Sequence, residues 1–286
     1  MPRYLDPKAD LTFKKVFGQH PKLLISFLNA VMPFEKGRLI EEVEYLPSEM
    51  VPENPGRKYS IVDARCTDNH KRQFIVEMQA SWEEGFMSRL VFNAGKAYVR
   101  QLEKGQDYDL LQPVYTLAIL SENFDHKTER FYHHYKMVNV ENSDEVIEGL
   151  EFILVELTKK FRPEKMSERK LAVLWLRFLK EVDENLKVIP PELTENEDIR
   201  QAVELCEEGA FTPAELAAYE KYWDMVRTEK TAMKSALKKG LAEGVAINQK
   251  KVIENGHRAG VPVEIIATMT GLTKEEVIKT IEEFKV

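Results

Sequence analysis

Two stretches of alternating residues, separated by a polar segment, stand out in the first third of the chain. The first runs from Tyr59 to Thr67 and the second from Arg72 to Ala80, and both are rich in β-branched and aromatic residues. The residues between them, 68–71, are typical of a turn. The pattern predicts a β-hairpin.

The polar residues of this hairpin suggest a site. Strand side chains alternate between faces, so Glu77 and Gln79 share one face of the second strand. If the loop has an odd length, Asp63 of the first strand lies opposite Glu77, with Cβ atoms about 5 Å apart. Two carboxylates that close can bind one Mg²⁺, whose oxygen ligands lie at about 2.1 Å. The alternative is that both carboxylates face water on an amphipathic sheet, and spacing alone does not separate these two interpretations.

Hydrophobic periodicity predicts further elements on both sides of the hairpin. An amphipathic helix begins at Asp10, places Phe13 and Phe17 toward the core, and resumes after Pro21. A strand near 42–46 and a loop at 52–56 precede the hairpin, and a helix over 82–104 that ends at Gly105 follows it. The remaining strands are expected at 114–120, near 131–140 and at 151–157.

The C-terminal half is expected to be helical. A buried helix follows residue 165, Pro190-Pro191 is the clearest linker, and a charged helix runs from Pro213 to Lys251. Gly240 and Gly244 each cost that helix about 1 kcal/mol relative to alanine, so we expect it to bend or fray there. The pattern thus predicts three parts, 1–160, 161–255 and 256–286.

The last part is expected to contain two short helices, the second opened by a capping box of Thr273 and Glu276. A seam of apolar residues joins them: Ile265, Ile266, Met269, Leu272, Val277, Ile278 and Ile281. The arrangement is similar to a helix-turn-helix reader of DNA. Because the second helix is acidic, protein contact or simple packing is favoured over DNA reading.

Composition narrows the class of protein. With 286 residues, of which 43% are hydrophobic and 31% charged, the chain can form one core and a smaller module. We expect a cytoplasmic protein without membrane contact, since no long apolar stretch or signal-peptide core is visible. Cys66 and Cys206 are expected to be reduced thiols. The sequence contains no glycine-rich phosphate-binding loop, so we expect no nucleotide cofactor.

The net charge of −7 is unfavourable for binding nucleic acid, whose phosphates require a positive surface. The charge is, however, unevenly distributed. Between residues 57 and 100, basic residues outnumber acidic ones, and the acidic excess lies mainly in the C-terminal half. A basic surface near the hairpin therefore remains compatible with DNA as a partner.

The predicted order α-β-β-β-α-β, with an Asp on one strand and Glu-x-Gln on the next, resembles the PD-(D/E)XK nuclease superfamily. The closer resemblance is to its transposase-like branch, the recombination-promoting nucleases (Rpn) of bacteria. Other stretches carry the resemblance along nearly the whole chain: 10–17, 98–108, 113–120, 239–244 and 266–272. It implies a restriction-endonuclease-like α/β core with a mixed sheet, followed by an α-helical C-terminal region.

The resemblance also implies a metal-dependent DNA endonuclease linked to recombination, transposition or defence against foreign DNA. Asp63, Glu77 and the Met78 carbonyl would hold Mg²⁺, for which Mn²⁺ can substitute. Gln79 would orient the attacking water. The phosphate would be bound by cations from the flanking helices: Lys14, Arg89 and Lys96.

Two residues depart from the superfamily pattern. Val62 replaces a proline, which matters little, but Gln79 occupies the place of a lysine that supplies positive charge. Compensation could come from the next helix, where Arg89, Asn93, Lys96 and Arg100 share a face. That face could equally be solvated. Asp10 is expected to cap its helix, with an outer carboxylate of the site as the alternative.

Two other functions stay open at this point. The missing lysine could have left a catalytically impaired DNA- or partner-binding protein. The long helix and the C-terminal segment could also make the chain a homodimer, which is compatible with nuclease activity because two sites can cut both strands.

Overall fold

The computed structural model describes residues 3–34, 37–47, 49–50, 60–61, 63–79, 83–161 and 170–284. The chain divides into two compact units, Met1–Tyr219 and Glu220–Val286, each with its own core. The loop expected at 52–56 lies outside the described residues. The division into three parts at residues 160 and 255 stays a prediction. Among the described helices, none is both long and apolar enough to cross a membrane.

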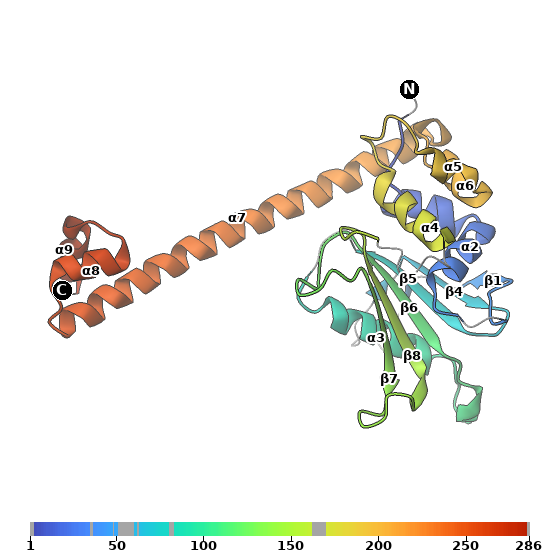
Figure 1. Ribbon diagram of the computed structural model, residues 1–286, viewed down its shortest axis with the longest axis horizontal. Coiled ribbons are helices and arrows are strands. Elements are labelled where there is room, and N and C mark those ends of the chain that lie inside the picture. Colours follow the sequence, from blue (N-terminus) through green and yellow to red (C-terminus); the bar gives the residue numbers. More distant parts are fainter. Residues whose placement is uncertain are drawn as a thin grey trace. The chain divides into compact units, whose positions relative to one another are not determined.

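The first unit is built on a mixed β-sheet (Figure 1). In the described part of the chain its strands follow the order β1 (Val43–Tyr45), β4 (Ala64–Asp68), β5 (Gln73–Gln79), β6 (Val114–Leu120), β8 (Val146–Glu156) and β7 (Tyr132–Val138). β5 pairs with β6 and β6 with β8 in parallel, and the other neighbours are antiparallel. The predicted mixed sheet and the predicted strand at 114–120 are confirmed.

Helices cover both faces of this sheet, which explains why every residue of β6 is buried. On one face the N-terminal helices and α4 (Lys170–Glu181) pack against the side chains of Phe74 and Val76. On the other face, α3 (Phe86–Val99) packs against Ile75 and Leu154 (Figure 1). Alternate residues of β5 thus contact the helices on opposite faces of the sheet.

The N-terminal helices anchor the first face. They are α1 (Asp10–Phe13), a π-helical turn η1 (Lys14–Gly18) and α2 (Pro21–Val31). Phe13 and Phe17 are 1% and 0% exposed, and the ring of Phe17 lies 5.5 Å from that of Trp175 in α4. Their predicted place in the core is confirmed.

The predicted hairpin forms with a shorter first strand. β4 begins at Ala64, whereas Ser60–Ile61 (β3) pairs with Glu49–Met50 (β2) in a separate two-stranded sheet. The single strand predicted over 59–67 is therefore corrected: its described residues form two strands that belong to different sheets. The described part of the turn is held by Asp68, whose carboxylate accepts the backbone N–H groups of His70 and Arg72.

The helix predicted over 82–104 is shorter, since α3 covers only Phe86–Val99. Gly85, with a φ of 92°, adopts a left-handed conformation just before its first residue, and Gly105, with a φ of 91°, adopts one in the turn after it. A short 3₁₀ turn, η2 (Tyr108–Leu110), then leads to β6. The strands predicted near 131–140 and at 151–157 correspond to β7 and β8, with β8 beginning earlier, at Val146.

Residues after α4 belong to the same core. The short helices are α5 (Pro191–Glu195), α6 (Glu197–Leu205) and η4 (Glu208–Ala210). Pro190 precedes α5 and Pro191 is its first residue, while Leu193 is fully buried in the main core. The prediction that Pro190-Pro191 is a linker is therefore wrong: these prolines begin a packed helix.

The second unit contains most of α7 (Pro213–Arg258), with α8 (Val263–Thr270) and α9 (Lys274–Glu283). α7 continues through Gly240 and Gly244, which corrects the expected bend. The Thr273 and Glu276 capping box is confirmed. Of the predicted seam, Ile266, Val277 and Ile281 are buried, whereas Ile265, Met269 and Ile278 are exposed.

Candidate active site

Asp63 and Glu77 lie at corresponding positions of the β4–β5 hairpin. The paired residues Ala64 with Val76, Arg65 with Ile75 and Cys66 with Phe74 define the register. Extended by one residue beyond β4, this register places Asp63 opposite Glu77, as the odd-loop prediction requires. Residues opposite each other in an antiparallel pair share a face, and Glu77 meets α3 on that face through Asn93.

The backbone of β5 explains how Asp63 is held. The Gln73 N–H and the Gln79 carbonyl bond to residues of the β6 segment, so odd-numbered residues of β5 point their backbone groups toward β6. Met78, at an even position, points its N–H and carbonyl to the β4 side, where β4 has not yet begun. The Met78 N–H instead donates to the carboxylate of Asp63. The Asp63 side chain thus takes a place in the sheet's hydrogen bonding.

α3 runs antiparallel to β5 across this face. Arg89 contacts Gln79, Asn93 contacts Glu77, and Ala97 packs in one cluster with Ile75. The side-chain amide of Asn93 donates to Glu77 Oε1 over 3.0 Å, and Asn93 itself is 1% exposed. The site is therefore formed by two strands and the helix over them.

Burial disfavours the ionised form of both carboxyl groups. Burial raises the pKa of Asp63 to about 6, an increase that the Met78 N–H opposes. Burial and the Asp63 carboxylate raise the pKa of Glu77 to about 7, although the Asn93 amide and Arg89 oppose it. Two neighbouring carboxyl groups whose pKa values are raised mainly by burial are typical of cation-binding and catalytic sites.

Asp10 and Lys14 lie near enough to Asp63 to change its pKa, which Asp10 raises and Lys14 lowers. The two form an ion pair of 2.9 Å on the first helical turns. Asp10 is the first residue of α1, and the capping position belongs to Ala9, without a side-chain hydrogen bond. The expected capping role is therefore wrong, and Asp10 instead acts electrostatically on the site.

The Gln79 side chain carries no charge, but a cation from α3, Arg89, lies beside it. The Arg89 guanidinium donates to Gln79 Oε1 over 2.6 Å and to Glu83 over 2.5 Å. It also lowers the pKa of both Asp63 and Glu77. A positive charge thus stands beside the side chain that replaces the expected lysine.

The donor set fits a hard divalent cation. Asn93 Oδ1 is buried without a hydrogen-bond partner among the described residues, and its amide lies against Glu77. This oxygen and the two carboxyl groups of raised pKa are oxygen acceptors of the kind that a hard cation takes. No cluster of three His, Cys, Asp or Glu is found in the described ranges, so remaining ligands would be carbonyl groups and water, which Mg²⁺ commonly retains.

The structure brings together most of the predicted site residues: Asp63, Glu77, Met78, Gln79, Arg89 and Lys14. Lys96 lies further along α3, beyond Asn93. Sequence reasoning placed Asn93 on the correct helix face but did not connect it with Glu77. His133 and His134 contact different carboxylates, those of Glu156 and Glu151, at 2.9 and 2.7 Å.

Comparison with known proteins identifies a family. The model of the PD-(D/E)XK nuclease family transposases matches residues 7–236. No curated protein and no solved structure matches the chain. The matched range contains the whole sheet, α3 and both carboxylates. The chain therefore belongs to the PD-(D/E)XK nuclease family transposases.

Proposed function

We propose that this protein is a metal-dependent DNA endonuclease that hydrolyses phosphodiester bonds. Membership of the family supports a nuclease-type function on nucleic acid. The observation that carries the finer proposal is the pairing of Asp63 with Glu77 under α3, where Asn93 and Arg89 meet the same strand. Within the family, we propose the recombination-promoting (Rpn) branch, with a role in recombination or in defence against foreign DNA.

In this proposal Asp63, Glu77 and the Met78 carbonyl hold the metal ion. The Met78 carbonyl suits this role because it lies on the same side of β5 as the Met78 N–H, which meets the Asp63 carboxylate. Bound Mg²⁺, or Mn²⁺ in its place, would lower the pKa of water and neutralise charge on the phosphate. Both carboxyl groups must be ionised to hold the metal ion. Because their pKa values are raised, their ionisation requires a higher pH or the presence of the cation itself.

The side chains around the carboxylates act on water and phosphate. Gln79 accepts from Arg89, and this hydrogen bond directs the guanidinium toward the carboxylate pair. Arg89 then supplies the positive charge that stabilises the phosphate in the transition state. Gln79 orients the attacking water, and Lys14 contributes a second cation near Asp63.

Plasmid nicking in the presence of Mg²⁺ or Mn²⁺ tests the proposal. Asp63→Ala and Glu77→Ala should each abolish nicking, because either change removes a metal ligand. Asp144→Ala is the matched control, since Asp144 is exposed in the turn that precedes β8. Undiminished cutting by both site variants would overturn the assignment. Retention of DNA by the wild-type protein without any cutting would instead favour a catalytically impaired binding protein.

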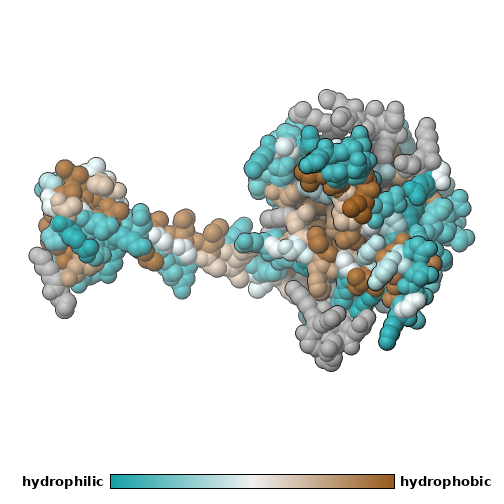
Figure 2. Space-filling model, turned by 90° about the horizontal axis from the view of Figure 1, so that it is seen from below, coloured by the Kyte–Doolittle hydropathy of each residue, from teal (hydrophilic) through white to brown (hydrophobic). Residues whose placement is uncertain are grey.

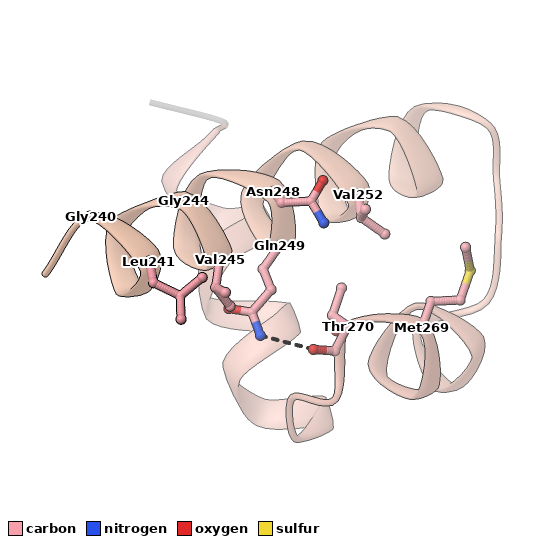
Figure 3. A pocket seen from close by; sticks show the side chains of 9 residues that line it. All are labelled: Gly240, Leu241, Gly244, Val245, Asn248, Gln249, Val252, Met269 and Thr270. Carbon is pink, nitrogen blue, oxygen red and sulfur yellow. Dashed lines mark hydrogen bonds between the residues drawn. The ribbon is translucent and has the colours of Figure 1, made fainter. Parts of the chain in front are cut away.

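We also propose that the protein is a homodimer through its second unit. Exposed apolar residues recur at every fourth position along α7, at Met233, Leu237, Leu241 and Val245, and apolar patches are visible on this helix in Figure 2. They lead into a groove of 380 Å³ between α7 and α8 (Figure 3). The groove is lined by Gly240, Leu241, Gly244, Val245, Asn248, Gln249, Val252, Met269 and Thr270.

A helix with an unpaired apolar stripe gains stability by packing, and a second copy presents the same stripe. Light scattering of the full chain should therefore give twice the chain mass. The double variant Leu237→Glu and Leu241→Glu should give the single mass, whereas Lys238→Glu, on a different part of the helix surface, should not. Equal masses for the wild-type protein and the double variant would contradict the dimer.

A further inference from the structure

Arg65 is a half-buried cation without a matching anion. It lies in β4 on the face that α3 covers, and its Nη2 donates to Gln73 Oε1 over 2.9 Å. Its Nε–H is buried and meets no acceptor among the described residues. No described carboxylate lies within ion-pair distance of its guanidinium. Burying a guanidinium in this way is unfavourable unless a negative group binds to it.

The charged neighbours of Arg65 make its position less favourable. Burial and the nearby Arg100 guanidinium lower the pKa of Arg65. Burial and the same Arg100 also lower the pKa of Lys96. Arg100 of the α3 segment therefore lies near both Arg65 of β4 and Lys96 of α3. We call these three residues the basic cluster.

Two other buried cations of the first unit are neutralised by carboxylates, which shows that Arg65 is exceptional. Arg72 lies 2.6 Å from the carboxylate of Asp68. Lys159 lies 2.5 Å from that of Glu156 and also donates to two backbone carbonyls. Where the fold needs a buried cation for its own stability, it supplies an acceptor. Arg65 has the Gln73 amide oxygen as an acceptor but no carboxylate among the described residues, and an external anion would complete its environment.

The basic cluster is placed beside the carboxylate pair on the same face of the sheet. Arg65 follows Asp63 by two residues, which is about 6.7 Å along a strand. On α3, Lys96 and Arg100 follow Asn93 by about 4.5 and 10 Å along the helix axis. Phosphates of one DNA strand are spaced by about 3.4 Å along the duplex axis. A strand whose reacting phosphate lies at Asp63 and Glu77 can therefore place a neighbouring phosphate at the cluster.

We propose that Arg65, Lys96 and Arg100 form a phosphate subsite that binds the DNA backbone within a few nucleotides of the bond that is cut. This inference rests on the proposed nuclease function and extends it by naming residues that position the substrate. Arg65 and Arg100 suit the role because a guanidinium presents several donors to one phosphate. In particular, a phosphate oxygen would accept the Arg65 Nε–H that the fold leaves unsatisfied.

Binding measured as a function of salt separates the subsite from the reaction site. Glu77→Gln removes the catalytic carboxylate, so a fluorescent 20-base-pair duplex stays intact while its anisotropy is followed. The logarithm of affinity should fall with the logarithm of salt concentration by about 0.9 for each phosphate contact. Adding Arg65→Gln or Arg100→Gln should each weaken binding about tenfold and reduce this slope by about 0.9.

Arg200→Gln is the matched control. Arg200 carries the same charge in the same unit, but it is exposed on α6, which packs on the other face of the sheet, and it pairs with Glu204. This variant should keep both the affinity and the slope. Thermal unfolding checks the fold of each variant, and Arg65→Gln should melt no lower than its parent because it removes an uncompensated charge.

The outcomes separate the two proposals. If the Glu77→Gln protein binds the duplex while Arg65→Gln and Arg100→Gln leave its slope unchanged, the subsite is wrong and the nuclease proposal stands. If the Glu77→Gln protein shows no salt-dependent binding of DNA, the nuclease proposal and the subsite both fail. Should Arg65→Gln not fold, Arg100→Gln alone decides, since Arg100 lies outside the strand. An equal loss in Arg200→Gln would show a general charge effect and would also overturn the subsite.

Discussion

The guanidinium of Arg89 donates a 2.6 Å hydrogen bond to the side-chain carbonyl of Gln79. The glutamine stands where the superfamily pattern has a lysine, and the arginine comes from the helix that covers the strand. The positive charge is thus displaced from the strand to α3, while the glutamine holds it near the carboxylates. In the proposed mechanism, Arg89 therefore supplies the charge that a lysine at position 79 would carry.

Removing Arg89 should therefore impair DNA cleavage severely. We expect Arg89→Ala to lower the cleavage rate by about 10²–10³-fold, a typical loss when one stabilising donor is removed. A lysine introduced in the same protein, Gln79→Lys, should restore part of the rate because it returns a cation to the strand. Initial rates of plasmid nicking at saturating Mg²⁺ measure both effects. Glu83→Gln is the control and should keep most of the activity; no rescue by the lysine would contradict the displaced charge.

Glu77 should make the metal-free protein less stable as the pH rises. Its pKa is about 7 in the folded protein and about 4.5 when unfolded, so the folded state binds the proton more tightly. The stabilising contribution is complete below about pH 4.5 and is lost as the pH rises through about 7. The Glu77→Gln variant does not lose stability in this way, because a glutamine side chain does not ionise. Between pH 4.5 and pH 8, the free energy of unfolding of this variant should improve relative to the wild type by on the order of 2 kcal/mol.

Urea unfolding in EDTA at the two pH values measures this difference. Asp144→Ala is the control, because it removes an exposed carboxyl group outside the site. A pH-independent difference for Glu77→Gln would mean that Glu77 ionises as an ordinary exposed carboxyl.

Asn93 should set the pH at which the site becomes active. Its amide donor lowers the pKa of Glu77, so Asn93→Ala should raise that pKa further. Asn93→Asp should raise it most, because it replaces the donor by a third carboxylate. The ascending limb of the pH–rate profile should move to higher pH in the order wild type, Asn93→Ala, Asn93→Asp. Rates of Mn²⁺-dependent nicking from pH 5 to pH 9 test this order, and superimposable profiles would exclude it.

The position of the carboxylate pair could be predicted from the sequence because a strand has a period of two. Once the loop has an odd length, Asp63 and Glu77 must share a face. The first residue of β4 could not be predicted in the same way. It depends on the Asp63 carboxylate taking the N–H of Met78 and on Ser60–Ile61 pairing elsewhere, and both are tertiary contacts.

The role of α3 was only partly predictable for a related reason. The spacing of Arg89 and Asn93 places them on one helix face. It does not determine whether this face meets solvent or the sheet. Only the antiparallel course of α3 over β5 brings Arg89 to Gln79 and Asn93 to Glu77. Arg65 was not recognised, since nothing in an alternating strand reveals that a cation lacks its anion.

Two glycines of α7 should respond in opposite ways to substitution by alanine. They are Gly240, within the helix, and Gly256, near its last residue. A Cβ at Gly240 would meet no atom within 4 Å, so Gly240→Ala should stabilise the helix by up to about 1 kcal/mol through helix propensity. A Cβ at Gly256 would lie 3.0 Å from Ile266 of α8, so Gly256→Ala should destabilise the second unit by forcing Ile266 to move. Far-ultraviolet circular dichroism during thermal unfolding measures both. Stabilisation by Gly256→Ala would show that α8 does not pack on α7 as closely as Ile266 requires.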